Sequence, residues 1–218
     1  MTIEKQFALL LHIRKDIKIS YYTTNQKILL ATKIKQQIEY SLEKHSHFDD
    51  EYPDINALER IDIIISHIPI LSDKEFHYHI SNLLQAIRNI YTPYSIPGNH
   101  RCYKLHLAVQ FKLRKNELYI SKFSSIIRVL RYSSNALDIS VGDKVLLING
   151  IETMDYVNQN KWVEAPVNSF TQSIINAMSF RDCARMPLPE TDTMELVLER
   201  LNGKAYTVDL PWVAEFSQ

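Results

Sequence analysis

The stretch that decides the fold is residues 140–150, which read Ser-Val-Gly-Asp-Lys-Val-Leu-Leu-Ile-Asn-Gly. Gly142-Asp143 predicts a tight turn, and Val145 to Ile148 is a short apolar run typical of a strand buried on both faces. Asn149-Gly150 is the pair preferred in turns whose two central residues have positive φ. The stretch therefore predicts a buried strand between two turns, inside a β-rich region.

Downstream of this stretch the pattern becomes helical and then returns to strands. Residues 167–180 have the spacing of an amphipathic helix. Its apolar residues are Phe170, Ile174, Ile175 and Met178. Residues 193–201 and 205–210 predict two strands joined by a hairpin turn at Asn202-Gly203. Pro211 is expected to end the pairing, because proline has no N–H to donate.

Upstream of the same stretch, residues 102–113 alternate between apolar and polar, which predicts one half-buried strand. Lys115-Asn116 is expected at a hairpin tip, residues 118–123 form the second strand, and residues 126–130 are a candidate third strand. The apolar face of the first strand consists of Leu105, Leu107, Val109, Phe111 and Leu113. Lys112, Arg114 and Lys115 make a local basic spot, which is typical of a solvated sheet face.

Residues 1 to about 92 contain no glycine and predict helices. Thr23 with Gln26, and Ser72 with Glu75, have the spacing of capping boxes, in which two backbone donors are satisfied reciprocally. Helices are expected after each box and over residues 54–69, and a further helix is expected over residues 3–15. Each apolar stripe needs a partner to bury it, so these helices predict a small bundle.

The fold class predicted is therefore α+β, with a helical N-terminal domain over residues 1–95 and a mostly antiparallel β domain over residues 96–218. The β domain is expected to carry one or two helices. Pro93 and Pro97-Gly98 mark the change of texture between the two domains.

Composition excludes several classes of protein. The 218 residues include 25 Lys and Arg against 25 Asp and Glu, and this balance argues against a general nucleic-acid binder. There are 4 glycines and they are not clustered, which excludes a phosphate-binding P-loop, a dinucleotide fingerprint and a G-x-S-x-G hydrolase elbow.

No cofactor or metal site is expected. Cys102 and Cys183 are too few for a disulfide framework or a cysteine-based zinc site, although Cys183 beside Arg181 could be either a packed residue or an activated thiolate. His77-x-His79 lies on a predicted helix, where residues two apart point in different directions. His45-x-His47 has acidic neighbours but lies in a polar linker, which makes a poor metal site.

The N-terminal apolar stretch is short and is flanked by Glu4, His12 and Arg14, without a small-residue cleavage site. It has the features of neither a signal peptide nor a membrane span. We expect a protein that does not bind membranes and that is cytoplasmic, or exported without a cleaved signal peptide.

The order of these features resembles a PDZ-like module. With residues 71–77 and 83–94 ahead of it, the stretch from about residue 25 to 213 is similar to the front half of the tail-specific, or C-terminal processing, serine peptidases. The similarity is to the branch typified by a chlamydial secreted protease, whose last PDZ-like strand ends in a Leu-Pro-Trp like Leu210-Pro211-Trp212.

Two departures from the family bear on activity. Residues 88–92 read Arg-Asn-Ile-Tyr-Thr where the family has Arg-Asp-x-His-Thr, so Tyr91 occupies the position of the family's catalytic histidine. A phenol with an unperturbed pKa of about 10 is a poor base at neutral pH. The family's serine nucleophile belongs to a crotonase-like domain that follows the PDZ-like module, and this sequence ends at Gln218 without one.

The resemblance implies two alternative functions. The first is a non-catalytic module that captures a peptide or protein segment by strand addition, with no catalytic residue of its own. The second is the recognition half of a split serine endopeptidase that acts with a separate catalytic chain. The expected groove lies between a strand and a helix, and its residues are Val109, Phe111, Leu113, Phe170 and Ile174. Whether the groove is filled by the chain's own side chains, and whether the chain forms a homodimer, stays open.

Overall fold

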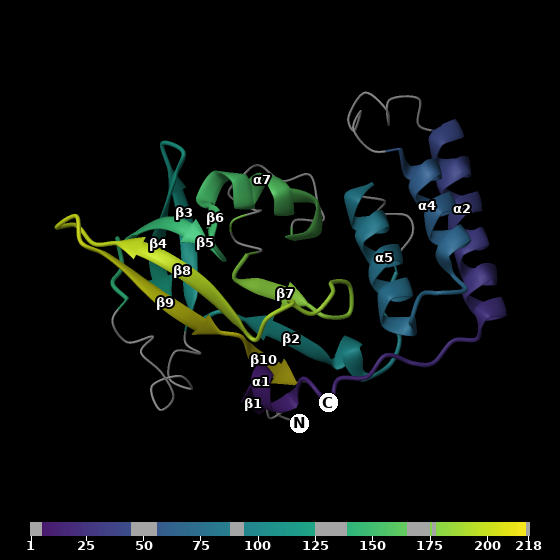
Figure 1. Ribbon diagram of the computed structural model, residues 1–218, viewed down its shortest axis with the longest axis horizontal. Helices are drawn as coiled ribbons and strands as arrows, with labels where there is room; N and C mark the ends of the chain where they lie inside the picture. The colour runs from purple at the N-terminus through teal and green to yellow at the C-terminus, as the bar shows by residue number, and fades with distance from the viewer. Residues whose placement is uncertain are drawn as a thin grey trace.

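Helices at one end of the molecule and two antiparallel sheets at the other make up the computed structural model (Figure 1). The structure describes residues 6–44, 56–87, 94–124, 139–164, 175 and 178–216, with side chains over 160–164 left aside. The predicted α+β class is confirmed. No helix within these ranges is long and apolar enough to cross a bilayer.

Three helices form the predicted bundle: α2 (Thr24–Lys44), α4 (Ala57–His67) and α5 (Asp73–Ala86). Both predicted capping boxes are present. Ser72 and Glu75 exchange their bonds, and the Thr23 backbone N–H donates to Gln26 Oε1 over 2.8 Å. The prediction that the second helix begins at Asp54 was wrong. It begins at Ala57, because the Asn56 side chain accepts from the Glu59 N–H over 3.0 Å.

The three helices bury one apolar cluster between them. α2 contributes Ala31, Ile34 and Ile38, at the three- and four-residue steps that the sequence predicts. The other buried members are Ala57, Ile61, Ile64, Ile68, Phe76, Ile80, Leu83, Leu84 and Ile87.

The helix predicted over residues 3–15 was wrong. Strand β1 (Gln6–Leu9) is followed by one helical turn, α1 (Leu10–Ile13). β1 pairs antiparallel with β10 (Val213–Phe216), with Gln6 opposite Phe216. A partner strand far away in the sequence therefore overrides the local helical pattern.

Two antiparallel sheets make up the β-rich end. One has the strand order β1-β10-β2-β7, and the other has the order β3-β4-β5-β8-β9 with the short β6 added to β5. The remaining strands are β2 (Tyr103–His106), β3 (Val109–Arg114), β4 (Glu117–Phe123), β5 (Lys144–Ile148), β6 (Ile151–Glu152), β7 (Phe180–Asp182), β8 (Thr193–Glu199) and β9 (Ala205–Pro211).

Two long segments run through both sheets. The single strand predicted over 102–113 is divided at Leu107-Ala108 into β2, inside one sheet, and β3, at the edge of the other. Residues 99–102 form a 3₁₀ turn, η1 (Asn99–Cys102), ahead of β2. Pro211 ends the pairing of β9 with β8, as predicted, and after Trp212 the chain continues as β10 in the other sheet.

The decisive stretch forms the predicted strand, as β5, between its two turns. The prediction that this strand is buried on both faces was wrong. Val145 and Ile148 are buried, while Leu146 and Leu147 are half-buried. A register shift between Val145 and Leu147 turns the strand part-way along its length.

The helix α7 (Thr153–Glu164) packs across β5, β6 and the bundle helix α5. Its start at Thr153 was not predicted. The helix predicted over 167–180 lies largely outside the described residues, but its predicted end at Phe180 was wrong, because Phe180 begins β7. Ile175 and Met178 are buried in the β-rich core.

A buried polar seam joins the bundle to the sheets. Tyr78 and Ser81 of α5 face the connection between β7 and β8, and the Leu188 N–H donates to Tyr78 Oη over 3.2 Å. The Ser81 hydroxyl and the Gln85 amide both donate to the Arg185 carbonyl. His100 lies on the same seam, where its Nδ1–H donates to the Cys183 carbonyl and Tyr78 Oη donates to Nε2 over 3.2 Å.

Candidate peptide-binding site

Strand β3 lies at one edge of its sheet. Its partner is β4, and among the described residues no strand pairs with its other side. Edge strands present backbone N–H and C=O groups on which an extended segment can pair. The edge of β3 is therefore the first candidate for peptide capture.

The turn between β3 and β4 decides which backbone groups face this edge. Lys115 and Asn116 have φ of 51° and 62°, the two positive values of a type I′ hairpin turn. Such a turn is closed by a hydrogen-bonded pair, here Arg114 opposite Glu117, and the bonded positions then alternate. Lys112 consequently bonds to β4, and Phe111 turns its backbone groups to the outer edge.

On the corresponding side of the preceding strand β2, the chain is already paired with β7. The Cys183 N–H donates to the Tyr103 carbonyl over 3.1 Å and the Leu107 N–H donates to the Ser179 carbonyl over 2.9 Å. These odd-numbered residues bond to β7, while the Ala108 carbonyl accepts from Ser124 on the β4 side. A segment added to β3 would therefore lie on the same side of the chain as β7 does at β2.

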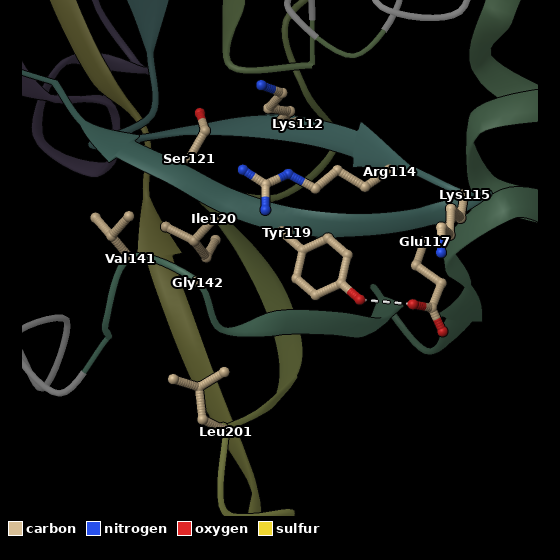
Figure 2. A pocket seen from close by; sticks show the side chains of 10 residues that line it. All are labelled: Lys112, Arg114, Lys115, Glu117, Tyr119, Ile120, Ser121, Val141, Gly142 and Leu201. Carbon is tan, nitrogen blue, oxygen red and sulfur yellow. Dashed lines mark hydrogen bonds between the residues drawn. The ribbon is translucent and has the colours of Figure 1, made fainter.

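A cavity of about 570 Å³ opens on the outer face of the β3–β4 hairpin (Figure 2). Ligand pockets of proteins commonly have this size. Val141 and Leu201, which are 55% and 93% exposed, form an apolar part of its wall. The other lining residues are Lys112, Arg114, Lys115, Glu117, Tyr119, Ile120, Ser121 and Gly142.

The charges in this cavity are unevenly paired. Glu117 lies opposite Arg114 in the hairpin, but its carboxylate accepts from Lys144 Nζ and from the Tyr119 hydroxyl, each over 2.5 Å. These bonds lower the pKa of Glu117 below its ordinary value. The described residues supply no ion pair within 4.0 Å for Lys112, Arg114 or Lys115.

The predicted groove residues are only partly placed. Val109 and Phe111 are 0% and 2% exposed, so their side chains belong to the core and a ligand could meet only their backbone. Leu113 is half-buried at the same edge. Phe170, Ile174 and Tyr91 lie outside the described residues, so the helix side of the groove stays a prediction.

The basic residues of the cavity lie on the sheet face that the sequence predicts to be solvated. Lys112 and Arg114 alternate with the apolar face of the predicted strand. The signal that was present is their spacing of two, which places both side chains on one face of the sheet.

One serine–histidine contact of the described residues, between Ser66 and His67, does not have the arrangement of a nucleophile–base pair. Ser66 Oγ lies 3.2 Å from His67 Nδ1, but both atoms bond to the Ile63 carbonyl at the end of α4. That Nδ1 therefore carries a proton and cannot accept one from the serine.

His100 lines a second cavity, of about 260 Å³, together with Tyr78 and Lys74. Burial lowers the pKa of His100 to about 4, and both its ring nitrogens are occupied. Within the described ranges, no group of three His, Cys, Asp or Glu residues could hold a metal ion.

Cys183 is a packed residue and not an activated thiolate. It is 0% exposed, and burial raises the pKa of its thiol to about 12. Reactive cysteines have lowered pKa values and accessible sulfur, so the cation-activated alternative does not hold.

Among solved structures, this architecture is similar to crystal structures of CPAF. The chain is similar to CPAF, a chlamydial serine protease: the mature form superposes with a TM-score of 0.63 and 8% identity, over 87% of this chain and 34% of that chain. Mature CPAF complexed with lactacystin gives 0.61 and 10%, over 85% and 35%. A serine-to-alanine mutant gives 0.58 and 12%, over 85% and 34%.

At this identity the likeness establishes a shared fold, and the chain spans about a third of the CPAF chains it matches. No family model matches the sequence, and no curated protein matches it. The chain therefore shares its fold with part of CPAF, and the edge strand of this fold is a candidate binding site.

Proposed function

We propose that these 218 residues form a non-catalytic peptide-binding module of serine-peptidase-like fold, which captures an extended segment along β3. The observation that carries the proposal is the position of β7, which already pairs with the strand that precedes β3. β7 pairs with β2 over residues 104–106, and among the described residues no strand pairs with the corresponding side of β3. Backbone pairing supplies affinity in this mode of binding, and side chains supply selectivity.

The test is selection from a displayed library of random peptides, followed by N-methylation of an enriched peptide. In an added strand, alternate residues direct their N–H groups to the protein. Methylating one alternate set should abolish binding, whereas methylating the other set should be tolerated. No enrichment, or equal loss from both sets, would contradict strand addition.

A second candidate is the recognition half of a split serine endopeptidase. It is favoured by the coverage, because the CPAF chains include about two thirds of additional chain beyond the part matched here. The added chain would have to bring both a nucleophile and a base.

Incubation with unfolded casein separates the two candidates. We expect no cleavage by the purified chain, with or without a crotonase-like polypeptide from the same genome. Cleavage by the mixture alone would favour the split enzyme. Cleavage by the 218 residues alone, lost when one of their serines is substituted, would overturn both candidates.

A further inference from the structure

We propose that the segment captured at β3 is an acidic peptide, with carboxylates at alternate positions that pair with Lys112 and Arg114 beside the cavity of the β3–β4 hairpin. This inference rests on the proposed function and adds the class of ligand. It follows from the position of the two cations, from the bonds that Glu117 makes to Lys144 and Tyr119, and from the geometry of an added strand.

The first step is that Lys112 and Arg114 lie on the outer face of the edge strand. The burial of β3 alternates, so that Val109 and Phe111 point into the core while Lys112 and Arg114 are exposed. Residues two apart in a strand are separated by about 7 Å, which is also the spacing between alternate side chains of a neighbouring peptide strand.

The second step is that the described residues give these cations no ion-pair partner. Glu117 faces Arg114 across the hairpin, yet Lys144 and Tyr119 occupy its carboxylate. Neither Lys112 nor Arg114 has an ion pair with any described residue. Figure 2 shows both side chains on the hairpin that borders the cavity.

The third step is the register that β3 imposes on a ligand. Lys112 and Arg114 direct their backbone groups to β4, so a residue opposite either of them on the outer side forms a non-hydrogen-bonded pair. Side chains approach most closely in such pairs, and opposite charges directly across strands are favourable. The peptide's acidic residues therefore lie opposite the cations. The residue between them lies opposite Leu113, and the residue on the other side of the acid that faces Lys112 bonds to the backbone of Phe111.

An acidic peptide fits better than a nucleic acid. Both would meet the cations, but the molecule as a whole carries 25 positive and 25 negative side chains, without the basic excess of a nucleic-acid binder. The edge of β3 also offers backbone pairing, which a nucleic acid cannot use. Single-stranded DNA is therefore an arm of the test.

The test uses fluorescent peptides of about ten residues, long enough to cover the strand, made of repeated Glu-Val, Gln-Val or Lys-Val. Polarisation should show binding of the Glu-Val peptide to the full chain. Binding should be about tenfold weaker for Gln-Val, as two cross-strand charge pairs imply, and weakest for Lys-Val. Salt should weaken the Glu-Val complex, because exposed charges are screened.

Charge reversal supplies the matched variants. Lys112→Glu with Arg114→Glu should lower affinity for Glu-Val at least tenfold and raise affinity for Lys-Val. Lys122→Glu reverses an exposed charge on β4 that does not line the cavity, so it should leave both affinities unchanged. Equal binding of Glu-Val and Gln-Val, equal effects of the two charge reversals, or tight binding of a thymidylate oligonucleotide would overturn the proposal.

The valines of the Glu-Val peptide separate failure of this inference from failure of the proposed function. N-methylation of the valines should abolish binding, and N-methylation of the glutamates should not, because only the valine N–H groups face β3 in this register. If Gln-Val binds as well as Glu-Val with this same methylation pattern, strand addition stands and acid selectivity fails. If no peptide binds, both fail.

Discussion

Gly98 shows how one residue can hold distant segments together. Its φ is 100°, and a Cβ built there would lie 2.4 Å from the Lys18 carbonyl oxygen and 3.0 Å from the Ser20 nitrogen. Gly98 also forms an isolated bridge with Ile19. The strand-like segment ahead of α2 is thus packed directly on the backbone ahead of β2.

We predict that Gly98→Ala destabilises the protein by about 2–4 kcal/mol, since backbone strain and a steric clash add together. Gly203→Ala is the matched control. Its φ is also positive, at 79°, but nothing lies within 4 Å of the added Cβ, so about 1 kcal/mol is expected. Urea unfolding measures both changes, and equal losses would contradict the close approach at Gly98.

Two buried histidines predict the response to acid. Burial lowers the pKa of His77 and of His100 to about 4, from the 6.5 of an unperturbed histidine. Between these values the unfolded chain binds protons that the folded chain does not. Stability is therefore full above about pH 6.5 and falls as the pH drops toward 4, by up to about 3 kcal/mol for each histidine.

The substitution His77→Gln should make the loss of stability between pH 7 and pH 5 smaller, whatever it does to stability at pH 7. Gln37→Ala, at an exposed position of α2, should leave the pH dependence unchanged because it removes no titratable group. Urea unfolding at the two pH values measures the slopes, and parallel slopes for all three proteins would count against this account.

At the scale of elements, the capping boxes were the most dependable signals in the sequence. We predict that Ser72→Ala removes about 1 kcal/mol of stability, because the Ser72 hydroxyl caps the Glu75 N–H at the start of α5. Ser66→Ala is the control, since that hydroxyl bonds back to the Ile63 carbonyl inside a helix and caps nothing. Thermal unfolding compares the two, and an equal loss from both would refute the capping role.

Elements that depend on short-range chemistry were predictable, and elements that depend on distant partners were not. The helices after Thr23 and Ser72, the hairpin tip at Lys115 and the strands β5, β8 and β9 follow from local patterns. The residues of β1 were predicted to be helical because their partner strand, β10, lies some two hundred residues away in the sequence. The break at Leu107 was not predicted because the apolar residues of the sequence keep a spacing of two from Leu105 to Phe111.

The candidate site shows the same limit. The sequence predicts the strand that borders the site. It does not predict that the Glu117 carboxylate accepts from Lys144, because that bond depends on the register of β4 with β5. The basic residues acquire meaning only when the pairing of every neighbouring charge is known. The domain division at residue 95 stays a prediction, although β1 and Leu10 lie with the β-rich core.

At the scale of the whole molecule, two apolar cores are joined through a polar seam. We predict that Tyr78→Phe costs about 1–3 kcal/mol, because it leaves the Leu188 N–H and His100 Nε2 buried without their partner. Hydrogen exchange should become faster both in α5 and in the connection after β7. Tyr40→Phe on α2, where the ring is 62% exposed, should change neither. Faster exchange confined to α5 would show that the seam does not couple the two cores.

The pairing of β1 with β10 has a mechanical consequence. Gln6 and Phe216 are opposite each other in an antiparallel ladder, so tension applied between these two residues would load its backbone bonds one after another instead of all together. β1 should therefore separate from β10 one backbone bond at a time and at low force, while the two cores remain folded.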